Sequence, residues 1–189
     1  MKRKITGILA GLLVAAGLVV ALYPQFTEWR YAFEQQAFAS EPTTGTVDGT
    51  AAAAGGEPMP EGIVAHLQIP KIDLDAWVVE GTGLTELDRG PGHYPGTPLP
   101  GERGNSGIAG HRTMHGHVFR RLDELEPGDE IVTVTPARRA VYRVISVRVV
   151  NKSDWSVVDP VDGYRLTLTT CHPVGSARQR LVVTAEMAQ

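Results

Sequence analysis

The sequence holds a single cysteine among its 189 residues, and its formal net charge is only −3. One cysteine excludes disulfide bonds within the chain, and it also excludes a zinc site made mainly of cysteine ligands. Beyond the basic N-terminus there is no cluster of Lys and Arg. A chain without a basic patch is not typical of proteins that bind nucleic acid, so we expect no nucleic-acid partner.

Long apolar runs are scarce as well. One uncharged run, Ile5 to Tyr23, follows the basic tip Met1–Lys4 and is long enough to cross a hydrocarbon core of about 30 Å as a helix. The apolar part of a cleaved signal peptide is shorter, about 7–15 residues. Basic residues favour a cytoplasmic N-terminus, whereas residues 24–61 carry one Arg and six acidic residues. We therefore predict an uncleaved single-pass anchor in residues 1–24, with the rest of the chain outside the cell.

The segment 25–61 follows the anchor. Residues 25–40 mix aromatic side chains with charged and amide ones, a composition that suits either a short interfacial helix or an irregular stalk. From Ser40 to Gly62 the chain is rich in Thr, Gly, Ala, Pro and acidic residues and has no aromatic residue, which predicts a disordered tether. We expect the anchor and tether to determine where the following domain is located and to contribute no residues to its hydrophobic core.

Short strands with turn residues between them dominate residues 62–189. We predict strands over residues 63–69, 72–79, 106–111, 130–134, 141–150, 165–171 and 180–185, and helical turns over residues 81–87 and 118–125. About eight short strands with few helices indicate a mainly β domain that closes into a barrel. The amount of chain leaves room for one core.

The cysteine, Cys171, lies at the end of one of these predicted strands. Alternation from Tyr164 to Cys171 puts two leucines on one face and Thr167, Thr169 and Cys171 on the other, so the leucines can enter a core while the sulfur points outward. Pro173 cannot donate to a sheet, so pairing should stop close to the thiol. The alternative is a buried cysteine that acts as a small apolar residue.

Two other residues favour a chemical role for the thiol. His111 ends the glycine-containing segment Gly107-Ile108-Ala109-Gly110-His111, and Arg180 opens the last apolar run. A thiol nucleophile, an imidazole that moves protons and a fixed cation beside a developing oxyanion together suit acyl transfer. Arg178 has the same parity as Arg180, so alternation alone does not choose between them.

These motifs resemble those of the sortases, membrane-anchored cysteine transpeptidases of bacteria. Thr-Leu-Thr-Thr-Cys-His-Pro, followed by Arg180, is similar to the sortase cysteine motif, and Ala-Gly-His-Arg-Thr is similar to the histidine motif. The resemblance covers residues 62–187, is closest to class E with class D as the near alternative, and implies a closed eight-stranded barrel. It marks residues 62–189 as the catalytic domain.

The resemblance also implies roles for these residues. Cys171 would attack the Thr–Gly amide of a sorting signal such as Leu-Pro-x-Thr-Gly or Leu-Ala-x-Thr-Gly, and His111 would protonate the leaving amine. Arg180, which begins the last predicted strand as the family's arginine does, would support the oxyanion together with Thr170. The implied partners are secreted proteins that carry the signal and an amine of the cell-wall precursor, with water as the poorer acceptor.

Three further histidines lie near these motifs, and we expect His115, His117 and His172 to be solvated loop residues. A zinc site made of histidines and Cys171 is the alternative, but no second cysteine or acidic motif completes a known zinc pattern. We therefore expect neither a metal nor another cofactor.

Three alternatives to wall anchoring are a pilin-polymerising sortase, a plain cysteine endopeptidase and a catalytically silent, membrane-tethered binding module. Pilin-type sortases often carry an aromatic lid before the barrel, and residues 41–62 contain no aromatic residue. A papain-like protease would place its cysteine before its histidine, and this chain has the reverse order. The binding module would tolerate loss of Cys171.

Overall fold

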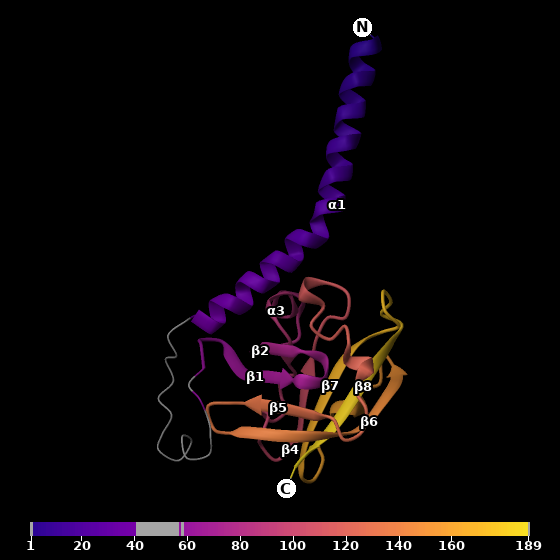
Figure 1. Cartoon of the computed structure of the whole chain (residues 1–189). Coiled ribbons are helices and arrows are strands. Elements are labelled where there is room, and N and C mark those ends of the chain that lie inside the picture. The colour runs from indigo at the N-terminus through magenta and orange to yellow at the C-terminus, as the bar shows by residue number, and fades with distance from the viewer. Residues whose placement is uncertain (1, 41–56, 58, 189) are drawn as a thin grey trace.

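The computed structural model describes residues 2–40, 57 and 59–188, with side chains from residue 11 onward. Eight strands form a closed barrel in the order β1-β2-β3-β4-β7-β8-β6-β5, and one long N-terminal helix precedes them (Figure 1). The predicted fold class is therefore confirmed. The strands are β1 (Ile63–Ile69), β2 (Leu74–Glu80), β3 (Gly92–His93), β4 (Gly104–Ala109), β5 (Glu130–Val134), β6 (Arg139–Asn151), β7 (Tyr164–His172) and β8 (Gln179–Met187).

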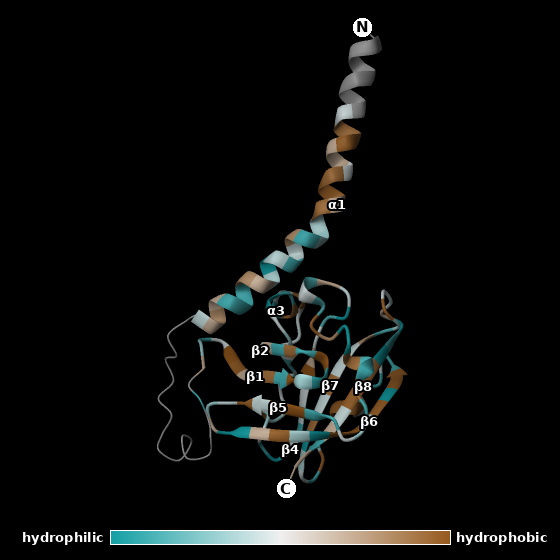
Figure 2. Ribbon diagram, viewed as in Figure 1, coloured by the Kyte–Doolittle hydropathy of each residue, from teal (hydrophilic) through white to brown (hydrophobic). Residues whose placement is uncertain are grey.

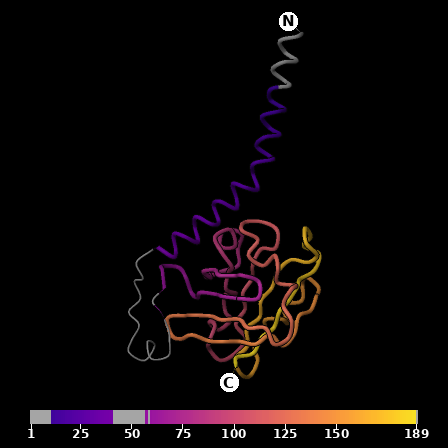
Figure 3. Tube along the Cα trace, in the orientation of Figure 1, coloured from indigo at the N-terminus to yellow at the C-terminus, as the bar shows by residue number. Residues whose placement is uncertain are grey.

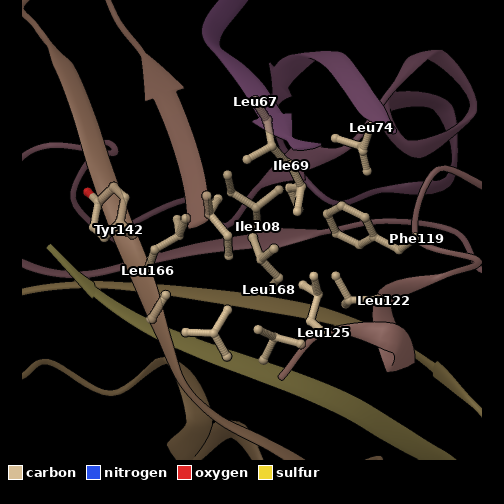
Figure 4. Packing of buried hydrophobic residues seen from close by; sticks show 14 of the residues in the cluster. Leu67, Ile69, Leu74, Ile108, Phe119, Leu122, Leu125, Tyr142, Leu166 and Leu168 are labelled. Carbon is tan, nitrogen blue, oxygen red and sulfur yellow. The ribbon is translucent and has the colours of Figure 1, made fainter. Parts of the chain in front are cut away.

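The barrel interior is filled by apolar side chains that alternate along the strands. In β1 every second residue is buried, and Leu166 and Leu168 of β7 are both fully buried, as their spacing predicts. Figure 4 shows these leucines in one packed cluster with Leu67, Ile108 and Tyr142. Burial of such side chains away from water is the main favourable contribution to the barrel.

Short helical segments connect the strands: η1 (Pro70–Ile72), α3 (Leu84–Arg89), η2 (His115–His117), η3 (Leu122–Glu124) and η4 (Trp155–Val158). The prediction of one helix over residues 118–125 is wrong. The buried side chains there are Phe119, Leu122 and Leu125, three residues apart, a spacing that matches the three residues per turn of a 3-10 helix rather than the 3.6 of an α-helix.

Helix α1 (Lys2–Ser40) has two parts of different character. It contains 39 residues, so it is about 58 Å long, roughly twice the thickness of a bilayer core. The helix bends near its middle, and the side chains of the first part are more apolar than those of the second (Figure 2). Proline inside a helix removes a backbone hydrogen bond and kinks it, so Pro24 accounts for the bend.

The second part of α1 lies against the barrel, which the sequence analysis did not expect. Phe38 is only 4% exposed and packs with Met59, Ile63, Val79 and Val134 in a second apolar cluster. The expectation that the anchor and tether give no core is therefore wrong for the helical part, because apolar side chains in α1 find a partner surface beside β2. Of the predicted tether from Ser40 to Gly62, residues 41–56 and 58 lie outside the described residues, whereas Ser40 ends α1 and Met59 is 4% exposed in this same cluster.

Candidate active site

Cys171 lies one residue before the end of β7, where the strand reaches the rim of the barrel. The thiol is partly exposed, and no disulfide involves it. Pairing with β8 continues to His172 and then stops, as the following proline predicts. The alternation prediction is confirmed for the leucines, which are buried, while Cys171 is partly exposed and absent from the core cluster.

The outer face of β7 is nonetheless covered along most of its length. Thr167 and Thr169 are 0% and 3% exposed, although the alternation had placed them on the outward face. The hydroxyl of Thr167 donates to Asn105, whose side-chain amide in turn donates to the carbonyls of Val157 and Asp159 around η4. A loop segment therefore covers this face, and the cover ends near Cys171.

His111 reaches the same rim because β4 runs parallel to β7. The register pairs Ala109 with Thr169, and the Gly110 amide donates to the Thr169 carbonyl at 3.1 Å. A Cβ at Gly110 would lie 2.6 Å from the ring of Phe119. Glycine at this position therefore lets the chain pass close to the core just before it presents the imidazole.

Arg180 reaches the rim from the other side of β7. It is the direct cross-strand partner of Cys171 in the antiparallel β7–β8 pair, and its guanidinium donates to the carbonyls of Ala177 (3.3 Å) and Gln179 (3.1 Å). Arg178 is exposed and precedes β8. The strand register therefore separates two arginines that alternation along the sequence left equivalent.

One cavity of about 270 Å³ joins the three groups. Its lining includes Cys171, His111 and Arg180, together with Tyr94 and Trp155, whose rings meet edge to face at 6.4 Å. The hydroxyl of Tyr94 is 2.8 Å from that of Thr169 in the wall beside the thiol. The rest of the lining comprises Thr82, Leu84, Leu87, Ala109, Gly110, Lys152, Asp154, Val157 and Thr169.

The Thr170 side chain is not brought into this cavity. It is 3% exposed, and its hydroxyl donates to the carbonyl of Gly110 at 2.8 Å. That bond ties the end of β7 to the segment that carries His111.

The charge state of His111 is set by its surroundings. Burial lowers the pKa of its imidazole below the ordinary value and the nearby His115 lowers it further, whereas the carboxylate of Asp88 raises it. The rings of His111 and His115 are 5.4 Å apart. Asp88 in α3 is 3.3 Å from Nε2 of His115 and 3.7 Å from Nε2 of His111. The lowered pKa favours the neutral imidazole, which can accept a proton.

Arg112, the residue after His111, holds the two chemical segments together. It is 2% exposed, its Nη1 donates to Nδ1 of His172 at 3.0 Å and to the carbonyl of Cys171 at 3.5 Å, and its Nη2 lies 2.7 Å from Asp123. His172 is therefore a partner of a buried guanidinium rather than the solvated residue that we predicted. His115 likewise faces Asp88 and His111.

The arrangement suits acyl transfer. A thiol, an imidazole and a guanidinium share one cavity, which is what nucleophilic attack with proton transfer and charge stabilisation requires. Within the part of the chain that the structure describes, no three His, Cys, Asp or Glu side chains are placed to hold a metal ion.

Sequence reasoning missed four residues of this region: Asp88, Tyr94, Arg112 and Trp155. None lies in a periodic strand pattern, and all four come from loops or short helical segments whose placement depends on the barrel. The only local signal was for Arg112, which directly follows His111 in the motif. Its burial could not be read from the sequence, because arginine is rarely buried unless it is paired.

Comparison with known proteins gives consistent results. The family model for the sortase domain matches residues 67–188. Sortase D of Bacillus subtilis is 32% identical over 187 residues, covering 90% of this chain and 93% of that protein. Sortase SrtE1 of Streptomyces coelicolor is 40% identical over 141 residues, covering 66% of this chain but only 40% of that protein.

Solved structures show the same fold. The Clostridium perfringens sortase D5 transpeptidase superposes with a TM-score of 0.68 at 27% identity, covering 84% of this chain and 98% of that one. Sortase E1 from Streptomyces coelicolor, solved with a tripeptide in its active site, has a TM-score of 0.64 at 37% identity and covers 72% of this chain and 92% of that one. The predicted placement near classes E and D agrees with these names.

The neighbours of His111 should shift its titration in opposite directions. Replacing His115 by Gln removes a positive charge, so the pKa of His111 should rise. Replacing Asp88 by Asn removes a negative charge, so the pKa should fall. NMR titration of histidine-labelled protein, with the His111 signal identified from its loss in His111→Gln, measures both shifts. Shifts of the same sign would contradict this electrostatic account.

Arg112→Ala should destabilise the fold by about 2 kcal/mol, because it leaves Asp123 and the carbonyl of Cys171 without a charged donor. Arg120→Ala, at an exposed position eight residues on, is the matched control and should change the free energy of unfolding by less than about 0.5 kcal/mol. Chemical denaturation measures both. If the two substitutions changed the free energy of unfolding equally, Arg112 would make no special contribution to the stability of the rim.

Proposed function

This chain belongs to the sortase family, and we propose that it is a membrane-anchored cysteine transpeptidase that attaches secreted proteins to an amine of the cell-wall precursor. The observation that carries the proposal is the meeting of Cys171, His111 and Arg180 in one cavity at the barrel rim. The substrate would be an extended signal of the Leu-Pro-x-Thr-Gly or Leu-Ala-x-Thr-Gly kind, cleaved between Thr and Gly. The tripeptide held in the active site of the Streptomyces coelicolor sortase E1 supports a peptide ligand at this place.

In the first half of the reaction, His111 takes the proton of the Cys171 thiol and the thiolate attacks the Thr carbonyl carbon. The C–S bond forms, and the carbonyl oxygen becomes an oxyanion that the Arg180 guanidinium faces. When the oxyanion collapses, the C–N bond breaks and the glycine amine leaves with the proton from the His111 imidazolium. The lowered pKa of His111 supports this order, since a neutral imidazole can accept the thiol proton.

In the second half, the acceptor amine attacks the thioester carbonyl and His111 takes a proton from it. A new amide forms, the C–S bond breaks, and the thiolate of Cys171 is released to be protonated again. Arg180 is partly exposed and Trp155 is exposed, and both line the cavity beside the thiol. Solvent, and with it a second substrate, can therefore approach the thioester from this side. Water reaching the same thioester would give the hydrolysed signal instead.

The membrane part of the proposal rests on α1. The helix is long and apolar enough to cross a bilayer, and its apolar window has no buried residue. With the basic residues Lys2, Arg3 and Lys4 at its start, we place the N-terminus in the cytoplasm and the barrel outside. This topology puts the thiol on the side where secreted proteins and cell-wall precursors meet.

Cys171→Ala should abolish both ligation and hydrolysis, because the nucleophile is lost, and should change unfolding little, because the side chain is partly exposed. Mass spectrometry after incubation of the full chain with a sorting-signal peptide and an amine reports ligated peptide, hydrolysed peptide or no product. His111→Ala should be comparably inactive. Ligation by the Cys171→Ala variant would sink the cysteine mechanism, and hydrolysis alone from the wild type would indicate a protease.

Arg180→Lys should lower turnover by on the order of 10²–10³, as loss of one oxyanion donor does elsewhere, because lysine keeps the charge but loses the planar fork. Arg178→Lys is the matched control two residues away and should keep wild-type turnover. Steady-state kinetics with the same peptide and amine compare the two. The opposite ranking would move the role to Arg178, and tolerance of both would remove arginine from the mechanism.

A further inference from the structure

One face of the second part of α1 is built for contact with the barrel. Glu28, Tyr31, Gln35 and Phe38 recur every three or four residues and therefore share one face of the helix. All four are partly or fully buried, whereas Gln36 is exposed and Phe33 is 60% exposed. The trace in Figure 3 shows this part of the helix passing along the barrel on the side of β2 and α3.

Gln35 acts as a partner for the edge of β2. Its Oε1 accepts the amide hydrogen of Trp77 at 2.8 Å, and its Nε2 donates to the carbonyls of Arg89 at 2.8 Å and Trp77 at 3.3 Å. Strand β3 pairs with β2 only at Val79 and Glu80. The Gln35 side chain thus forms hydrogen bonds with the backbone of β2 at Trp77, where β3 does not pair. Its bond to the carbonyl of Arg89 also holds the end of α3.

Three further contacts hold α3. Glu34 lies 3.4 Å from Nε of Arg89, and the Arg89 guanidinium lies over the ring of Phe38 at 5.0 Å. A Cβ at Gly90 would lie 2.7 Å from both Nε2 of Gln35 and the carbonyl oxygen of Trp77. The backbone at Gly90, just after α3, therefore packs directly against the side chain of Gln35.

The other end of the contact face holds η2. Glu28 accepts the amide hydrogen of Gly116 at 3.3 Å and lies 3.5 Å from Nε2 of His117. The ring of Tyr31 lies so close to Gly116 that an added Cβ would be 2.1 Å from it. Any side chain at Gly116 would have to displace the tyrosine.

The two segments held by α1 are the ones that carry the charged neighbours of His111. Asp88 directly precedes Arg89 in α3, and His115 directly precedes Gly116 in η2. Asp88 is within 3.7 Å of both imidazoles, and the two rings are 5.4 Å apart. The other charged or titratable groups lining the cavity with His111 are Tyr94, Cys171, Arg180, Lys152 and Asp154.

We propose that the segment Glu28–Phe38 of α1 is a positioning element of the active site, in which Gln35 holds α3 and Glu28 and Tyr31 hold η2 so that Asp88 and His115 stay against His111. The second part of α1 then helps to position the catalytic residues, in addition to any role of the helix in membrane attachment. This inference rests on the proposed transpeptidase function of the same site. In this proposal Gln35 does not touch the substrate. It affects turnover because it keeps Asp88 in place beside His111.

The test compares Gln35→Ala with Gln36→Ala in the full chain in detergent micelles. We expect Gln35→Ala to lose about tenfold in kcat with little change in KM, since small misplacements of catalytic groups cost rate, and Gln36→Ala to match the wild type. The loss should be much smaller when Gln35→Ala is added to Asp88→Asn, because both changes act through one contact. Phe38→Ala should behave like Gln35→Ala, and Phe33→Ala like the wild type.

NMR titration of His111 gives a second measurement that needs no catalysis. Asp88, which raises the pKa of His111, is carried by the segment that Gln35 holds, so the pKa should fall in Gln35→Ala, as in Asp88→Asn, and stay unchanged in Gln36→Ala. If Gln35→Ala unfolds the barrel, Gln35→Glu keeps the acceptor for Trp77 and removes only the donated bonds. Equal kcat and equal His111 titration in the Gln35 and Gln36 variants would overturn the proposal. A wild type that forms no product would refute the proposed function, and the titration would still decide this inference.

Discussion

The parallel pairing of β4 with β7 is the constraint on which the site depends. Parallel strands point their carboxyl ends to the same edge of a sheet, so the residues that follow β4 and those that end β7 must meet at one rim. His111 follows β4 by two residues, and Cys171 lies one residue before the end of β7. Strand β8 is antiparallel to β7 and begins at this rim, which brings Arg180 directly opposite Cys171. Backbone pairing therefore brings residues from three different parts of the fold to one rim.

Buried polar contacts keep that rim in register. The Thr170 hydroxyl bonds the carbonyl of Gly110, and the Arg112 guanidinium reaches both the Cys171 carbonyl and Nδ1 of His172. Buried donors left without partners are costly, so each of these bonds resists separation of the histidine segment from the cysteine segment. Thr170 and Arg112, the neighbours of Cys171 and His111 in the sequence, thus stabilise the relative position of the two candidate catalytic residues.

The N-terminal helix joins a candidate membrane span to this geometry. Its first part has the length and composition of a membrane span, and its second part carries Phe38 into a core cluster and Gln35 onto the edge of β2. The segments it touches, α3 and η2, carry Asp88 and His115. One helix therefore contains both the candidate membrane span and the contacts to the segments that carry the neighbours of His111.

The sequence by itself determined the apolar helix and the barrel class, and it singled out Cys171 and His111 as candidate catalytic residues. These follow from local patterns: a long uncharged run, alternation along short strands, and motifs in which the chemical residues stand next to glycine or proline. Alternation also correctly put Leu166 and Leu168 in the core. The resemblance already assigned the role to Arg180 rather than Arg178, and only the tertiary structure showed that Arg180 lies directly opposite Cys171 in the neighbouring strand. The tertiary structure also decided the burial of Thr167, Thr169 and Arg112, the 3-10 turns around Phe119, and the docking of α1, since each depends on surfaces that come together only when the barrel closes.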